Sequence, residues 1–249
     1  MRLLLLTLLA AACLTARADT RSELHATLSG FGGASAVKAE VGYEYWSETG
    51  DKEGMAEEAC TVAVGIEEDA GGLHVMWRRD TLADAAEEVR AASVGGEVKT
   101  PMRRAMGLLS ATVLSGYLNG AVELNRWLGQ SELEKEEAVD WKGAPATLLT
   151  FKNTPRVNAQ TKKYLKELVS TVRVWVGEGG VPLAADRSVR FKGRALLVLS
   201  FESSDCDAFE FAVRGDRLVV TRHARETHGS GTGGKNTQKT VATLTLAPE

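Results

Sequence analysis

The sequence predicts an α+β fold in which a curved, mostly antiparallel β-sheet, a half-barrel-like meander, is covered by about three helices. Two observations lead to this prediction. Short stretches of alternating apolar and polar residues recur along the chain between turn-forming residues, which is typical of strands joined by hairpins. Residues 105–122, in the middle of the chain, carry no charge, and apolar side chains recur there at helical spacing.

The N-terminus predicts a cleaved signal peptide over residues 1–18. A positive charge at Arg2 precedes the mainly apolar residues 3–14, and small residues stand before a cleavage site after Ala18. The apolar run is too short to cross a bilayer. The leucine upstream of Cys13 stands one position too far back for a lipoprotein signal, so a lipid anchor at Cys13 is not expected. We therefore expect an exported, periplasmic protein.

The mature chain, residues 19–249, is expected to be a single β-rich domain with a mildly acidic charge. Loss of Arg2 and Arg17 lowers the Lys and Arg count from 30 to 28 against 33 acids, so the formal net charge changes from −3 to −5. This balance argues against nucleic acid as a partner, because binding to phosphates needs a basic surface. The length suits one well-buried core.

The first strands are predicted from period-two alternation. Residues 37–46 place apolar side chains on one face and charged ones on the other, which indicates a half-buried strand. The clearest hairpin joins residues 61–67 to residues 73–79 through the glycine-rich turn at 69–72. These segments predict one side of the sheet.

Other segments before the central stretch are predicted as helix or loop. Asp80 and Thr81 begin a helix of alanine and glutamate that continues to Ala92. Residues 19–36 fit either an edge strand or a short helix. Residues 49–58 are acidic and predict a surface loop.

The second half predicts a helix, a hairpin and a further helix before a run of strands. Thr100 and Pro101 begin the central helix. A single helix to Leu128 would be roughly 40 Å long, so a break near Asn119 and Gly120 is expected. The remaining predicted elements are a hairpin of 132–141 with 144–151, a helix over 158–170, and strands at 171–176, 181–183, 188–191, 195–201, 208–213, 218–223 and 240–246.

Two short motifs resemble functional signatures but are better explained as turns. Residues 229–235 match the spacing of a phosphate-binding loop, yet Asn236 replaces the serine or threonine that would hold magnesium, and a strand follows rather than a helix. Arg214-Gly215-Asp216 spells an adhesion tripeptide between two predicted strands. Both segments are expected to be hairpin connections.

No catalytic or metal site is predicted, and the protein is not expected to be an enzyme or to need a cofactor. His223 and His228 flank Glu226 with a spacing that matches no zinc motif, and they are expected on the surface or in loops. The parity of Cys60 points it to the core, whereas Cys206 lies beside acidic residues and is expected at a solvent-exposed loop edge. A disulfide between them is therefore not expected.

The central helix leaves two interpretations open. Its polar residues form one thin stripe, which argues against a membrane span and for burial on most of its circumference. It is either a core helix packed permanently on the sheet or a lid over an apolar cavity. The residues predicted to line such a cavity are Trp77, Met106, Leu109, Val113, Tyr117 and Trp175.

The layout resembles that of the periplasmic lipoprotein-carrier (LolA-like) superfamily. The segments on which the resemblance rests are Gly72–Trp77, Val174–Val176 and Gly180–Leu183. It implies a sheet curled into a half-barrel, helices that plug its inner face, and acyl chains bound inside. The family's acyl-gating arginine matches no single position here, so no functional residue is carried over.

These observations lead to two hypotheses of function. The first is a non-enzymatic periplasmic protein that binds a lipid or another hydrophobic small molecule between the sheet and the central helix. The second is a structural or interaction module of the cell envelope, with an envelope protein as its partner and a filled core. Neither hypothesis makes the chain an integral membrane protein.

Overall fold

The computed structural model describes residues 20–51, 54–95, 98–129, 131–155, 157, 162–195 and 199–248. This part of the chain forms one ten-stranded antiparallel sheet with five α-helices, so the predicted α+β class is confirmed. The sheet is not closed into a barrel, and the helices exceed the three expected. The predicted signal peptide lies outside the described residues.

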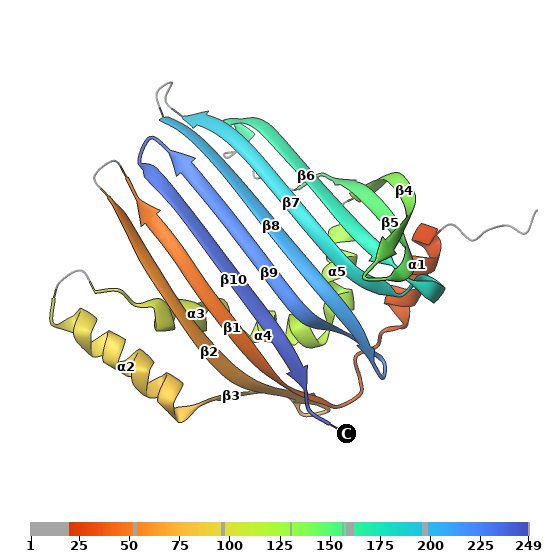
Figure 1. Cartoon of the computed structure of the whole chain (residues 1–249), viewed down its shortest axis with the longest axis horizontal. Helices are drawn as coiled ribbons and strands as arrows, with labels where there is room; N and C mark the ends of the chain where they lie inside the picture. The colour runs from red at the N-terminus through yellow and green to blue at the C-terminus, as the bar shows by residue number, and fades with distance from the viewer. Residues whose placement is uncertain are drawn as a thin grey trace, which may run out of the picture.

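The described strands form a three-stranded and a seven-stranded meander, which are joined where β1 pairs with β10. Their order is β3-β2-β1-β10-β9-β8-β7-β6-β5-β4, and β1 pairs with β10 in antiparallel register (Figure 1). The strands are β1 (Val37–Gly50), β2 (Met55–Asp69), β3 (Gly72–Trp77), β4 (Ser131–Trp141), β5 (Ala144–Asn153), β6 (Leu165–Val176), β7 (Pro182–Ala195), β8 (Leu199–Arg214), β9 (Arg217–Gly231) and β10 (Gly234–Leu246).

The helices between β3 and β4 connect the two edge strands and therefore have to cross the sheet. Figure 1 shows α3, α4 and α5 behind the sheet, with α2 beside the β2–β3 edge. We call the face of the sheet that α3, α4 and α5 cover the inner face. The helices are α1 (Thr20–Gly30), α2 (Arg79–Ser93), α3 (Pro101–Leu108), α4 (Ala111–Leu118) and α5 (Gly120–Leu128), and a 3-10 turn, η1, spans Glu178–Gly180.

The hydrophobic core lies between the inner face and these helices. On β1 the alternate residues Val41, Tyr43 and Tyr45 are buried, as the period-two pattern predicts. Leu114 of α4 and Leu124 of α5 are buried against the same cluster. The central segment thus contributes to a packed core over most of its length.

The central segment is broken twice rather than once. The break at Asn119, between α4 and α5, was expected from the sequence. A second break falls at Leu109 and Ser110, where the Ser110 hydroxyl accepts a hydrogen bond from the backbone N–H of Val113 and caps α4. Three short helices can follow the curve of the sheet, which one straight helix of the same length could not.

The predicted helix over residues 158–170 is wrong at residues 165–170. Residues 165–170 begin β6 and pair with β7, with Leu168 opposite Phe191 and Ser170 opposite Val189. Residues 158–161 lie outside the described part. Pairing with a long neighbouring strand outweighs the local helical pattern, since strand preference depends on cross-strand contacts.

The predicted acidic loop at residues 49–58 is also wrong at both ends. β1 continues to Gly50 and β2 begins at Met55, so the two strands pair through Glu58 and beyond. Other strands are also longer than predicted. The separate strands expected at residues 181–183 and 188–191 belong to a single strand, β7, over residues 182–195. The hairpin connection expected over residues 229–235 is a shorter turn at Thr232 and Gly233, because residues 229–231 belong to β9 and residues 234–235 belong to β10.

The two cysteines lie on opposite faces of the sheet and are free thiols. Cys60 is half-buried on the inner face, opposite the buried Tyr45. Burial, reinforced by the carboxylates of Glu88 and Glu58, raises the pKa of the Cys60 thiol to about 11. Cys206 is exposed on the outer face. The sequence predicted the core-facing side of Cys60 and the exposure of Cys206 correctly, but Cys206 lies within β8 rather than at the expected loop edge.

Helix α1 forms from the segment for which strand and helix were both open, and it packs against η1. Gly180 has a φ of +75°, and a Cβ there would lie 2.9 Å from the backbone of Glu23 and from the Thr27 hydroxyl. That hydroxyl donates to the carbonyl of Gly179 at 2.9 Å. A close approach of backbones therefore requires glycine at position 180.

Substituting Gly180 with alanine is expected to lower the free energy of unfolding by about 1–3 kcal/mol, because it adds a clash to an unfavourable φ. Gly179→Ala is the matched control, since Gly179 also has a positive φ but a Cβ there would meet nothing within 4 Å. Urea denaturation of both variants measures the difference. Equal losses would contradict the contact between α1 and η1.

Candidate functional site

Five of the six residues predicted to line a cavity lie at or near the interface between helices and sheet. Leu109 and Tyr117 are buried in the core. Trp77, at the end of β3, and Met106, on α3, are half-buried. Val113 is exposed on α4. The structure thus places these five residues at or near the layer between the helices and the sheet, where Leu109 and Tyr117 contribute to the packing of the core.

Trp175 is not brought to the same place. Its neighbours Val174 and Val176 are buried on the inner face, so Trp175 projects from the outer face of β6. There its ring packs against Trp141, with 4.9 Å between the ring centroids, and the Arg173 guanidinium lies 5.3 Å from its centre. This aromatic pair covers the outside of the sheet.

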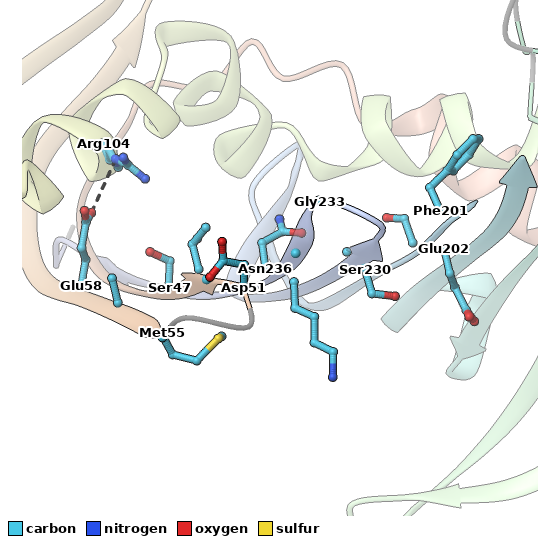
Figure 2. A pocket seen from close by; sticks show the side chains of 18 of the residues that line it. Ser47, Asp51, Met55, Glu58, Arg104, Phe201, Glu202, Ser230, Gly233 and Asn236 are labelled. Atoms are coloured by element: carbon cyan, nitrogen blue, oxygen red, sulfur yellow. Dashed lines mark ion pairs between the residues drawn. The ribbon is translucent and has the colours of Figure 1, made fainter. Parts of the chain in front are cut away.

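A hollow of about 970 Å³ opens at the far end of the inner face, where the strands continue beyond the helices (Figure 2). Its size is at the upper end of the range for small-molecule sites. None of the six predicted residues lines it. The lining residues come from the hairpin ends of β1–β2, β7–β8 and β9–β10 and from α3, and they include Ser47, Met55, Ala56, Glu58, Arg104, Phe191, Phe201, Ser203, Gly229, Ser230 and Asn236.

One end of the hollow is aromatic. Phe191 and Phe201 pack edge to face with 6.2 Å between their centroids, and both side chains are half-buried. The Phe201 ring lies over Gly193 on the neighbouring strand, where an added Cβ would come within 2.0 Å of it. The Phe201 ring can therefore pack against the sheet because position 193 has no side chain.

The other end of the hollow is charged. Glu58 of β2 and Arg104 of α3 form an ion pair, with 3.5 Å between Arg104 Nε and Glu58 Oε2 (Figure 2). The Glu58 side chain is 14% exposed and that of Arg104 is 55% exposed. Glu58 Oε2 is buried and accepts no hydrogen bond from the described residues. Buried carboxylate oxygens are normally hydrogen-bonded, so this atom is an exception.

The sheet surface between the two ends, which we call the floor of the hollow, is polar and carries small side chains. Ser47 lies directly opposite Glu58 in the β1–β2 register, and Ser203 lies opposite Gly229 in the β8–β9 register. Ser47 is fixed by a hydrogen bond of 2.9 Å with the hydroxyl of Tyr45. Small side chains on inward positions leave the volume that large core residues fill elsewhere on this face.

A buried charged network joins β7, β8 and β9 on the inner face. Asp207 of β8 hydrogen-bonds His223 at 3.0 Å and accepts a hydrogen bond from Arg187 at 2.6 Å, while Arg225 lies 3.7 Å away. Burial alone would raise the pKa of Asp207, but the His223 hydrogen bond and the arginine charges outweigh it, and the pKa lies below its ordinary value. Asp207 is therefore an ionised, paired carboxylate.

This network reaches the helix layer through Tyr117. Its hydroxyl hydrogen-bonds His223 Nδ1 at 3.1 Å. Burial raises the pKa of Tyr117, so the hydroxyl keeps its proton and is not an activated nucleophile. The prediction of a surface position for His223 is wrong, because its side chain is enclosed by Tyr117, Asp207 and Phe209. The arrangement fixes α4 to the sheet.

A second polar network fixes the junction between α4 and α5. Arg217 of β9 donates to Glu68, to the Asn119 side chain and to the carbonyl of Ser35, at 2.5, 2.8 and 2.6 Å. The Arg217 side chain is only 2% exposed. One side chain thus joins β9, β2, the break between two helices and the segment before β1.

A signal for the hollow is present in the sequence but easily overlooked. Along the inner face of β1, the large side chains of Val41, Tyr43 and Tyr45 are followed by Ser47 and Thr49 at the same parity. A change from large apolar to small polar residues on one face predicts that the space above that face is not filled by core. The partners across the hollow come from distant segments, which the sequence alone does not place.

Comparison of the chain with protein-family models, curated proteins and solved structures finds no match. None of the described helices is both long and apolar enough to cross a membrane. In the part of the chain that the structure describes, no three histidine, cysteine, aspartate or glutamate side chains are grouped as metal ligands.

Proposed function

We propose that this chain is an exported, periplasmic, non-enzymatic binding protein that holds a single-chain amphipathic ligand of the lipid class in the hollow. The observation that carries the proposal is the hollow itself, about 970 Å³ with an aromatic end, a polar floor and a charged end. Apolar walls combined with a few convergent polar groups are characteristic of small-molecule sites.

The position of the hollow changes the sequence-based hypothesis. A ligand was expected between the sheet and the central helix, but the buried Leu114, Tyr117 and Leu124 occupy much of that space. The strand ends beyond α3 offer room without displacing core side chains. The proposed ligand therefore lies beside the helix layer.

The absence of catalysis is part of the proposal and is supported by how the buried Asp207–His223 pair is used. Asp207 and His223 are engaged with Arg187 and Tyr117 below the helices rather than facing the hollow. A general acid or base must reach the proton that it transfers, and these groups are enclosed by their partners.

A second candidate function, a structural or interaction module of the cell envelope, is favoured by the packing between helices and sheet. Leu109, Leu118 and Trp127 are buried in one cluster with the strands, as in a permanently packed core. In that case the hollow would hold no ligand. The two candidates differ in one measurable property, which is the binding of an amphiphile at the hollow.

Filling the hollow is expected to weaken the binding of a fluorescent amphiphile such as dansyl-undecanoic acid. Ser203→Trp places a large side chain on the floor and should weaken binding by about tenfold or more. Ser204→Trp is the matched control, because the adjacent side chain lies on the outer face, beside Ser188 and Cys206. Fluorescence titration of the wild type and both variants gives the dissociation constants.

The control variant makes the result specific to the hollow. Equal affinity of wild type, Ser203→Trp and Ser204→Trp would place the dye elsewhere and contradict the proposed site. No saturable binding by the folded wild type would favour the structural candidate. Circular dichroism confirms that each variant is folded.

A further inference from the structure

We propose that the ligand of the hollow carries a zwitterionic head group, with an ammonium that donates to Glu58 and a phosphate that binds Arg104. This inference rests on the proposed function and defines the chemical class of its ligand. It follows from three features: the incompletely satisfied Glu58 carboxylate, the exposure of Arg104, and the order of the charged and aromatic groups along the hollow.

The first feature is a carboxylate with unused acceptor capacity. Glu58 projects inward from β2 between Ser47 on the opposite strand and α3. Its Oε2 is buried beside Arg104 without a hydrogen bond, and the 14% of the side chain that stays exposed lines the hollow, where an ammonium can reach the carboxylate. Lys99, which is close in the chain to α3, donates instead to the Glu57 carbonyl at 2.7 Å. A carboxylate that is mostly removed from water is stabilised by a charged N–H donor. An ammonium supplies up to three such donors.

The second feature is a guanidinium with room for an anion. Arg104 is more than half exposed, and its Nε lies 3.5 Å from Glu58 Oε2. Arginine binds phosphate in a bidentate manner through its planar fork of N–H groups. A phosphate on the solvent side of Arg104 would therefore leave the contact with Glu58 in place.

The third feature is the order of groups along the hollow. Figure 2 shows Glu58 and Arg104 at one end and Phe201 at the other, with Ser47 and Asn236 between them. A head group on the ion pair would direct an acyl chain along the floor toward Phe191 and Phe201. The adjacent positive and negative groups match a zwitterion better than a head group of either single charge.

The test compares three lysophospholipids that share one acyl chain and differ in the head group. Lysophosphatidylethanolamine has an ammonium with N–H donors, lysophosphatidylcholine has a quaternary ammonium without them, and lysophosphatidylglycerol has no cation. Displacement of dansyl-undecanoic acid from the wild type is expected to show about tenfold tighter binding of the ethanolamine lipid than of either other lipid, corresponding to one charge-assisted hydrogen bond.

Variants at the two ends of the hollow assign the preference to Glu58. Glu58→Gln is expected to remove the preference, whereas Glu202→Gln should retain it, since Glu202 lines the hollow beside Phe201 and pairs with Lys192 at 3.3 Å. Arg104→Gln should weaken all three lipids by a similar factor, because each contains a phosphate. The comparison of the three lipids on the wild type needs no variant, so it stays valid if one of the variants folds poorly.

The outcomes separate this inference from the function on which it rests. Equal affinity for the three lipids, with loss of binding in Ser203→Trp, would overturn the head-group inference and leave the binding function intact. A preference that survives in Glu58→Gln would overturn the role of Glu58. Failure of every lipid to displace the dye, or of the dye to bind, would overturn both proposals.

Discussion

Replacing Arg217 with methionine is expected to lower the free energy of unfolding by about 3–5 kcal/mol, the largest effect of any substitution proposed for this protein. The side chain is 2% exposed and donates to Glu68, Asn119 and the Ser35 carbonyl. Its removal leaves Glu68 without a cation and Asn119 with an unpaired oxygen. Guanidinium chloride denaturation, followed by circular dichroism, measures the loss.

Arg222→Met is the control for this prediction, since Arg222 is an exposed arginine on the outer face of the same strand. Its effect should be within about 0.5 kcal/mol of zero. If Arg217→Met were no more destabilising than Arg222→Met, the network would not hold the α4–α5 junction to the sheet.

The network around Arg217 and Glu68 should make the free energy of unfolding fall as the pH is lowered. Burial alone would raise the pKa of Glu68, but hydrogen bonds from Asn119, Arg217 and Ser115 outweigh it, and the pKa lies below its ordinary value of 4.5. A lowered pKa contributes stability above pH 4.5 that is lost as the pH falls through the lowered value. The stability difference between wild type and Arg217→Met should therefore narrow below pH 4.5. A stability difference between the two proteins that does not change with pH would contradict the pairing of Arg217 with ionised Glu68.

Replacing Asp207 with asparagine is expected to cost about 3 kcal/mol, because it removes the charge but keeps the shape. Arg187 would then lose its carboxylate partner while stacked 5.0 Å from the Trp127 ring, and His223 would lose its anionic partner. Thermal or chemical denaturation at neutral pH measures the effect on stability.

Asp205→Asn provides the comparison for Asp207. Asp205 is on the same strand and face, is more exposed, and pairs with Arg225, whose side chain is 43% exposed. Its loss should cost less than about 1 kcal/mol, as for other solvent-exposed ion pairs. Equal losses at the two positions would show that burial does not decide the strength of this network.

Much of the sheet could be predicted because strand alternation is a local signal. The residues of β1 alternate in sequence as they alternate between core and solvent, and the Asp69–Gly72 turn joins β2 to β3 as expected. Local pattern failed at residues 165–170, where pairing with β7 decides the structure. It also failed at Glu57 and Glu58, whose charges suggested a loop although both pair with β1.

The candidate site was less predictable than the fold because it depends on non-local contacts. Leu109 and Tyr117, predicted to line a cavity, are buried in the core and do not line the hollow, because apolar residues at helical spacing mark packing and do not reveal where packing ends. The hollow depends on how far the hairpins extend past α3, and on Phe201 lying over Gly193. The proximity of Glu58 to Arg104 likewise arises only when β2 meets α3.

The most direct test of the central claim, that the hollow holds an amphipathic lipid, is mass spectrometry of lipid extracted from folded protein purified from the periplasm. We predict that wild type and Ser204→Trp carry about one lipid per chain and that Ser203→Trp carries little or none. Folded wild-type protein without stoichiometric lipid, or equal lipid in all three proteins, would contradict it.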